Sequence, residues 1–390
     1  MTPRRLAVLA CLAAALVAAG WLARPYVDGA ALVIDLSGRE FSWRRWLPVR
    51  VRPVDIRDLS VPTRHGRVTG RLYRPAGAQG PTARTVLVIP GLHTGGVDEP
   101  RLDRLTARLA ATGLTVVSLP LPDLRQLRVV PRSTDMIEDA ALWLSTQPDL
   151  ARDGRVSLVG ISFGGGLTLA AAGRPALAGR VEMVMSFGGH GDLPRVIEYL
   201  CTGLLPDGTV QPAHDYGAAI LLLAALPHLV PAGQVAPLEH AVRVFLDASM
   251  VDVAEPQRSA LLFAEARRLG EALPEPARAI MADVSARDVS RLGPRLRPLA
   301  GVIGGDPGLS AERSPVTTAR VFLLHGTPDP VIPQTETSTL AAFYDRSPAR
   351  QGNRVEWLIT PAISHADATG TMAAADAWAL VRFWTRLLNR

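Results

Sequence analysis

Three residues of the types that perform nucleophilic catalysis are spread along the chain: Ser162, Asp329 and His365. A serine hydroxyl is a weak nucleophile until a base removes its proton, and a carboxylate must hold that base in the right tautomer. Ser162 lies in Gly160-Ile-Ser-Phe-Gly164, after a Val/Leu-rich run and before Leu167-Thr-Leu-Ala170. This pattern predicts a strand, a tight turn that exposes the serine Oγ, and then a helix.

The two partners of the serine are expected in loops that follow later strands. Asp329 comes after the apolar run Val321–Leu324, and His365 comes after Val355–Thr360. Each has an ordinary alternative: a turn-stabilising aspartate beside two prolines, and a histidine in a surface loop. Together, in the order Ser162, Asp329, His365 and each after a strand, they predict a catalytic triad.

An oxyanion hole needs two backbone N–H groups close to the nucleophile. The strand Thr85–Pro90 ends in the glycine-rich loop Gly91-Leu-His-Thr-Gly-Gly96. We expect Leu92 to supply one N–H, with His93 as the alternative, and Phe163 to supply the other.

A second carboxylate follows another strand. His190-Gly-Asp192 comes after Val181–Phe187. His93 and His190 either line the pocket or bond to loop backbone, and we favour the backbone role.

The elements that must position these residues alternate between short apolar runs and amphipathic stretches. A hairpin is predicted over Asp55–Pro75, and the runs between helices indicate a parallel sheet covered on both faces. The predicted strands are Thr85–Pro90, Leu114–Leu119, Val156–Gly160, Val181–Phe187, Val321–Leu324 and Val355–Thr360; the predicted helices are Arg101–Ala111, Ser133–Thr146, Phe163–Ala172, Glu336–Tyr344 and Thr371–Asn389.

The alternation stops between Gly189 and Thr318, where the patterns are helical and no strand is evident. We interpret this stretch as an inserted helical cap. Its apolar run Ala218–Pro227 is too short for a membrane span and contains proline, so it belongs to the cap core or, less favoured, to the wall of an apolar pocket. The expected segments are 1–25 (anchor or signal), 26–53 (linker), 54–188 (core), 189–318 (cap) and 319–390 (core).

The N-terminus has the features of a membrane-targeting segment. Arg4 and Arg5 precede Leu6–Ala23, which carries no charge and is long enough as a helix to span a bilayer. We expect an uncleaved anchor through residues 6–23, with the catalytic domain outside the cytoplasm. A cleaved signal, with Ala18 and Gly20 near its cleavage site, would make the protein secreted.

Composition excludes several classes of function. The net charge of +6 comes without arginine clusters interleaved with aromatic residues, so we expect no nucleic-acid partner. The two cysteines, Cys11 and Cys201, provide no disulfide framework. No spacing typical of a metal site is present, and we expect neither a metal nor a cofactor.

The chain resembles serine hydrolases of the α/β-hydrolase superfamily, of the esterase or lipase type, over residues 54–390. The resemblance lies in Pro90-Gly-Leu-His93, Gly160-Ile-Ser-Phe-Gly164, His325-Gly-x-x-Asp329-x-x-x-Pro333 and Ser364-His365. There is no His-Gly-Gly-Gly run of the kind seen in hormone-sensitive-lipase-like esterases.

The resemblance implies hydrolysis of carboxylic esters through an acyl-enzyme, with Ser162 as nucleophile, His365 as base and then acid, and Asp329 as the orienting acid. Some members carry the acid after the strand that corresponds to Val181–Phe187, which makes Asp192 the alternative acid. The resemblance also implies a small-molecule ester as substrate, and the apolar cap favours an apolar group on it. Acyl transfer or peptide cleavage on the same triad, and a non-catalytic membrane-tethered binding protein, are the alternatives. The oligomeric state is left open.

Overall fold

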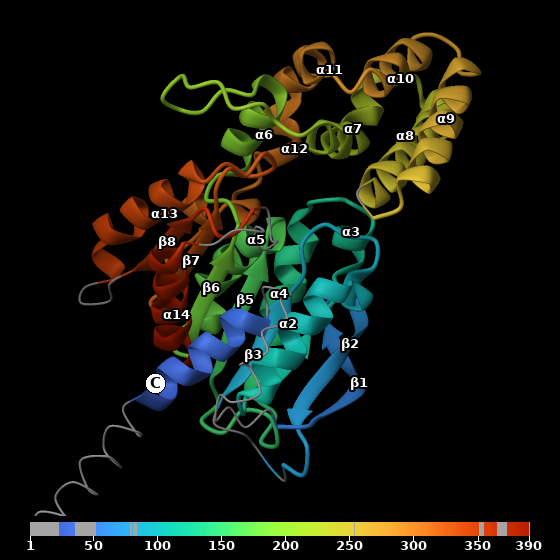
Figure 1. The fold of residues 1–390 in the computed structure, drawn as a ribbon. Helices are drawn as coiled ribbons and strands as arrows, with labels where there is room; N and C mark the ends of the chain where they lie inside the picture. The colour runs from blue at the N-terminus through green and yellow to red at the C-terminus, as the bar shows by residue number, and fades with distance from the viewer. Residues whose placement is uncertain are drawn as a thin grey trace, which may run out of the picture.

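The computed structural model of the chain describes residues 23–35, 52–78, 80, 84–252, 254–350, 355–364 and 373–389. Its described part contains one eight-stranded sheet with the strand order β1-β2-β4-β3-β5-β6-β7-β8 (Figure 1). The strands are β1 (Val54–Thr63), β2 (Gly66–Pro75), β3 (Thr85–Ile89), β4 (Thr115–Ser118), β5 (Val156–Ile161), β6 (Val181–Phe187), β7 (Arg320–Gly326) and β8 (Glu356–Thr360).

The sheet is antiparallel at one edge and parallel elsewhere. β1 pairs antiparallel with β2, and β2 pairs antiparallel with β4. From β4 to β8 every neighbouring pair is parallel, so the loops that follow these strands meet at one edge of the sheet. This is the strand arrangement of the α/β-hydrolase fold, and the fold predicted from the sequence is confirmed.

Helices cover both faces of the sheet because the strands are apolar on both sides. In β3, Val86 and Val88 pack into one buried cluster while Leu87 and Ile89 pack into the other, as the alternation of side chains along a strand requires. The first cluster is covered by α2 (Pro100–Ala111) and α14 (Ala374–Leu388), and the second by α4 (Pro131–Ser145), α5 (Phe163–Ala172) and α13 (Thr335–Arg346), with the short α3 (Pro122–Arg125) before α4.

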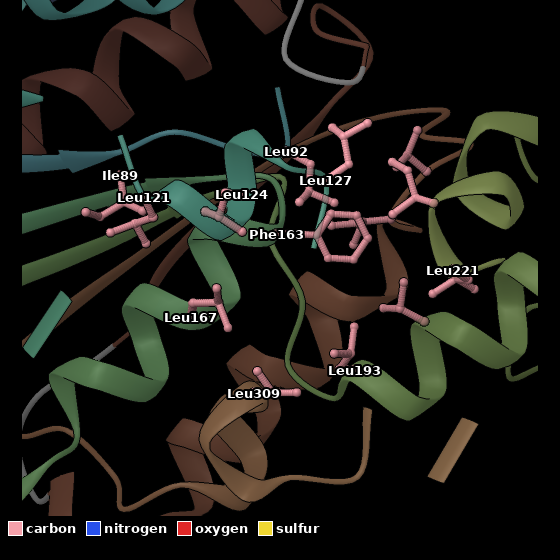
Figure 2. Close-up of a cluster of buried hydrophobic side chains, with 14 of the residues drawn as sticks. Ile89, Leu92, Leu121, Leu124, Leu127, Phe163, Leu167, Leu193, Leu221 and Leu309 are labelled. Carbon is pink, nitrogen blue, oxygen red and sulfur yellow. The ribbon is translucent and has the colours of Figure 1, made fainter. Parts of the chain in front are cut away.

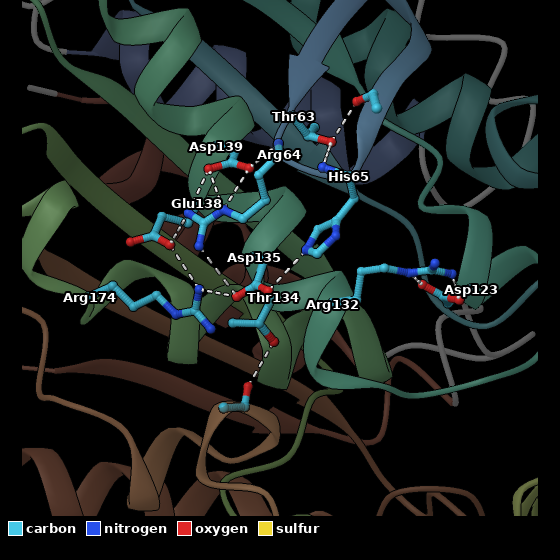
Figure 3. A network of polar contacts seen from close by, with 12 residues as sticks. Thr63, Arg64, His65, Asp123, Arg132, Thr134, Asp135, Glu138, Asp139 and Arg174 are labelled. Atoms are coloured by element: carbon cyan, nitrogen blue, oxygen red, sulfur yellow. Dashed lines mark hydrogen bonds and ion pairs between the residues drawn. The ribbon is translucent and has the colours of Figure 1, made fainter.

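An ion-pair network fastens the β1–β2 hairpin to α4 (Figure 3). At the hairpin turn, Arg64 donates to both carboxylate oxygens of Asp139 at 2.6 to 3.0 Å and to Glu138 at 2.8 Å. Arg174 donates to Asp135 at 2.6 Å and to Glu138 at 2.8 Å. The β1–β2 hairpin is therefore held to α4, which lies on the same face of the sheet as α5, the helix that follows Ser162.

Residues 23–35 form a helix within and just before the first part of 26–53, for which the sequence predicted no helix. The helix lies against α14 (Figure 1), where the Pro25 carbonyl accepts a hydrogen bond from Thr385 Oγ1 at 3.2 Å. The Tyr26 ring stacks on Trp378 at 5.7 Å between centroids, and Leu32 is buried in the cluster of α2 and α14. Tertiary packing thus makes a helix of a segment whose own sequence contains proline and glycine.

The expected membrane anchor, Leu6–Ala23, lies outside the described residues except for Ala23. Within the ranges that the structure describes, no helix combines the length and the apolar character needed to cross a bilayer.

The chain between β6 and β7 is helical where it is described, apart from short turns and an isolated bridge between Leu204 and Val210. One apolar cluster runs from Ile89 in the sheet past Phe163 to Leu221 in this region (Figure 2), so the two parts share a core. The helices are α6 (Leu193–Thr202), α7 (Asp215–Leu229), α8 (Ala232–Val251), α9 (Pro256–Glu271), α10 (Ala277–Ser285), α11 (Val289–Leu296) and α12 (Ala300–Gly304).

Candidate active site

Ser162 occupies a strained turn between β5 and α5. Its φ of +53° and ψ of −132° are unusual for a residue with a side chain. Its N–H donates to the Phe187 carbonyl at 2.7 Å, which holds the turn against the end of β6. Strain of this kind persists only where the surroundings enforce it, and it is concentrated at functional sites.

The glycines of the pentapeptide are required by close backbone contacts. A Cβ on Gly160 would collide with the Gly164 carbonyl oxygen, and a Cβ on Gly164 would collide with the Pro90 carbonyl oxygen. A Cβ on Gly91 would lie 3.0 Å from Ser162 Cβ. The loop after β3 and the turn after β5 are therefore packed backbone against backbone at the nucleophile.

Asp329 is fully buried in the loop after β7. Its Oδ1 accepts hydrogen bonds from the backbone N–H groups of Val331 at 2.8 Å and Ile332 at 3.0 Å. Its Oδ2 lies 3.2 Å from His325 Nε2 and 3.9 Å from the position of a Cβ on Gly188, just after β6. Since Phe187 in β6 also receives the Ser162 N–H, the carboxylate and the serine flank the end of the same strand.

His325 holds this loop rather than the substrate. Its Nδ1 is 2.7 Å from Thr337 Oγ1, and its Nε2 is 2.8 Å from the Ile332 carbonyl oxygen. The ring is fully buried. We conclude that His325 is a positioning residue for the Asp329 loop.

His365 lies outside the described residues, so its role stays a prediction. The chain just before it is placed: Thr327 N–H donates to both the Thr360 and Ile363 carbonyls at 3.1 Å. Ala362 and Ile363 line the same cavity as Ser162. The residues just before His365 therefore lie beside the cavity that contains Ser162.

A cavity of about 420 Å³ opens over Ser162. Leu92 and Phe163, the expected oxyanion donors, both line it, and Phe163 is the first residue of α5. The first N–H groups of a helix lack intrahelical acceptors and carry partial positive charge, so this end of α5 favours an anion. On the cap side, His214, Tyr216 and Met250 line the cavity.

Two of these cap residues contact the oxyanion loop. Tyr216 is half-buried, burial raises its pKa, and its hydroxyl lies 3.5 Å from the Leu92 carbonyl oxygen. Thr94 Oγ1 lies 3.8 Å from Met250 Sδ. The cap and the oxyanion loop therefore form one wall of the cavity.

The structure separates the three remaining candidates. His93 lines the cavity, its Nδ1 accepts from the Gly95 N–H at 3.0 Å, and burial lowers its pKa. His190 is fully buried behind Phe163, with ring centroids 5.7 Å apart; its Nε2 contacts the Leu309 carbonyl at 2.8 Å, and burial lowers its pKa. His93 thus lines the cavity and also bonds to loop backbone, whereas His190 contacts backbone and is not among the described lining residues.

Asp192 is committed elsewhere. One oxygen caps α6 by accepting from the Arg195 N–H at 2.9 Å, and the other accepts from Arg313 Nε at 2.5 Å. Neither Asp192 nor Asp329 is among the described residues that line the cavity, and the choice of Asp329 as the acid stays a prediction.

Several lining residues have no chemical signature in the sequence. Tyr216 and Met250 come from the cap, and Val33, Leu380 and Trp384 come from the helix 23–35 and α14. Each is an aromatic, thioether or aliphatic side chain on a helix, and such residues ordinarily belong to a core. Among the described residues, no cluster of His, Cys, Asp and Glu could hold a metal ion.

The sequence matches no protein-family model and none of the curated proteins with which it was compared. Among solved structures it is similar to an esterase of Pyrobaculum calidifontis (15% identity, 88% of this chain and 83% of that chain, TM-score 0.42). It is also similar to a bacterial heroin esterase (16%, 86% and 85%, TM-score 0.48) and to brefeldin A esterase, a bacterial homologue of human hormone-sensitive lipase (15%, 93% and 81%, TM-score 0.46). At these low identities, the case for a function rests on the residues of this site.

Proposed function

We propose that the protein is a serine hydrolase that cleaves carboxylic esters through an acyl-enzyme intermediate. The observation that carries the proposal is Ser162, held at a φ of +53° at the start of α5 and facing the cavity. The buried carboxylate of Asp329 lies in the loop that follows β7. The chain order and the positions after the strands are those of this reaction's catalytic triad.

In the proposed reaction, His365 accepts the Ser162 proton as Oγ attacks the ester carbonyl carbon, and it returns that proton to the leaving alcohol. Water then attacks the acyl-enzyme by the same route and releases the acid. The Asp329 carboxylate orients His365 and stabilises the imidazolium. Its two backbone hydrogen bonds, from Val331 and Ile332, fix the direction in which the second oxygen points.

The negative charge of the tetrahedral intermediate falls on the carbonyl oxygen. We assign its stabilisation to the backbone N–H groups of Leu92 and Phe163, aided by the N-terminal end of α5. The close contact between Gly91 and Ser162 supports this assignment, because it keeps the Leu92 backbone next to the nucleophile.

The decisive variant is Ser162→Ala. It is expected to abolish hydrolysis of p-nitrophenyl acetate and labelling by a fluorophosphonate probe, because no other group supplies the attacking oxygen. The matched control is Ser338→Ala, an exposed serine on α13, which should keep full activity and labelling. Ester hydrolysis that survives in a folded Ser162→Ala protein would refute the proposal.

We also propose, from the sequence, that residues 6–23 anchor the protein to a membrane with its catalytic part outside the cytoplasm. The support is Arg4 and Arg5 before a long run without charge.

A further inference from the structure

The cavity at Ser162 continues away from the cap into the layer between the sheet and its α2/α14 face. Val33, Leu105 and Trp384 line this part, and they come from the helix 23–35, α2 and α14 respectively. All three belong to the buried apolar cluster on that face. We call this part of the cavity the apolar arm.

The near end of the arm lies at the strand ends that hold the catalytic residues. Ile161, Phe187 and Leu324 line the cavity at the ends of β5, β6 and β7. Ile161 directly precedes the nucleophile. The arm therefore begins at the reacting centre, and a group that leaves Ser162 in this direction meets apolar side chains.

The helix 23–35 packs closely against α14, and this contact fixes the position of Val33 at the cavity. At Gly29, a Cβ would lie 2.6 Å from Thr385 Oγ1 and 2.9 Å from the Val381 carbonyl oxygen, so only glycine allows this approach to α14. The next turn buries Leu32 and Val33, which are 2% and 9% exposed. The position of Val33 is thus set by the contact between two helices.

The two sides of the cavity differ in chemistry. The cap side carries His214 and Tyr216, and the mouth near α2 carries Glu99 and Arg101, which bond to each other at 2.6 Å. Among the described residues that line the arm, the side chains are hydrocarbon or aromatic, and the exposed Arg104 lies on the α2 side of the cavity. The leaving alcohol must be protonated and must depart first, whereas the acyl group stays on Ser162 until water attacks. An apolar space suits the part of the substrate that stays.

We propose that the apolar arm binds the acyl chain of the ester and that Val33 is the residue that limits its length. The substrate class is then esters of medium-chain or longer aliphatic acids. This inference rests on the proposed hydrolase function. It adds that the helix 23–35, which precedes the sheet in the chain, forms one wall of the acyl-binding part of the cavity.

The experiment compares two series of esters on the full chain. The first varies the acyl group on p-nitrophenol through acetate, butyrate, octanoate and laurate; the second varies the alcohol of acetate esters over the same chain lengths. Val33→Trp should lower kcat/KM for octanoate and laurate, relative to that for acetate, by at least about tenfold, because each excluded methylene costs binding in an apolar pocket. The alcohol series should not change.

Two further variants separate a specificity wall from a structural helix. Val33→Ala enlarges the arm and should raise the laurate-to-octanoate ratio, so the test does not depend on whether tryptophan is accommodated. Leu32→Val, on the same helix but not lining the cavity, should lower thermal stability and leave every chain-length ratio unchanged.

The outcomes distinguish this inference from the function on which it rests. If acetate hydrolysis requires Ser162 but neither Val33 variant changes the acyl-chain ratios, the inference is overturned and the hydrolase stands. If the Val33 variants change the alcohol series instead, the arm binds the leaving group and the inference is also overturned. If hydrolysis does not require Ser162, the proposed function itself fails.

Discussion

At the scale of single residues, the two candidate acids differ in what their carboxylates already do. Asp329 receives two backbone N–H groups on one oxygen, and its loop is held by the buried His325. Asp192 caps a helix and pairs with Arg313. Both aspartates follow strands, so the sequence alone left them as alternatives. The distinction depends on Arg313, which is distant in sequence and approaches only in the folded chain.

The acid assignment predicts opposite effects of two isosteric substitutions. Asp329→Asn should lower kcat for p-nitrophenyl acetate by about a thousandfold or more, because an amide cannot hold the required histidine tautomer. Asp192→Asn should keep kcat within about twofold and cost about 1–2 kcal/mol of unfolding free energy through its weakened ion pair. Steady-state kinetics and urea unfolding measure the two effects. A near-silent Asp329→Asn would reverse the assignment.

At the scale of elements, apolar patterning predicted the strands and the helices of the two layers closely but missed the helix 23–35. Buried parallel strands are short runs of Val, Ile and Leu, and β3, β5 and β6 lie where those runs stand. The helix 23–35 was missed because Pro25 and Gly29 lower its intrinsic propensity. Its stability comes from α14, which is encoded at the other end of the chain.

We call the ion pairs between Arg64 at the β1–β2 turn and α4 the hairpin clamp, and we expect them to contribute measurably to stability. Arg64→Ala should lower the unfolding free energy by about 1 kcal/mol, and less at high salt, because the Arg64 side chain is half exposed and its ion pairs are screened. Arg67→Ala is the matched control on the same hairpin, since Arg67 bonds only to Ser60 in the described structure and carries no ion pair there. Activity should be unchanged in both. Equal losses in the two variants, at low and high salt alike, would argue against the clamp.

At the scale of the whole molecule, the cap and the sheet act as one body around the site. The apolar cluster that joins Ile89 to Leu221 is continuous, and Tyr216 meets the oxyanion loop from above. The sequence predicted a helical insertion between β6 and β7, but not which of its faces would meet Ser162. The packing of apolar helix faces determines which face meets Ser162. The apolar pattern of one helix is compatible with more than one packing partner, so the sequence alone does not predict it.

The proposed anchor makes a prediction for the full-length protein. Carbonate washing of membranes should leave the full chain in the pellet, whereas a chain without residues 1–22 should appear in the supernatant with the same acyl-chain profile. The reason is that Val33 and the other residues named in the wall of the cavity all lie after residue 22. Release of the full chain by carbonate would contradict the anchor.

The seat of the helix 23–35 on α14 has a practical consequence for where the chain can be shortened. A chain that starts at residue 23 keeps the helix, but a chain that starts at residue 54, where the sequence places the beginning of the core, lacks Val33 and exposes one side of the cavity to water. Such a protein would keep its sheet and its nucleophile while losing its preference among substrates. Selectivity would then depend on the helix 23–35, whereas turnover would depend on residues from Ser162 onward.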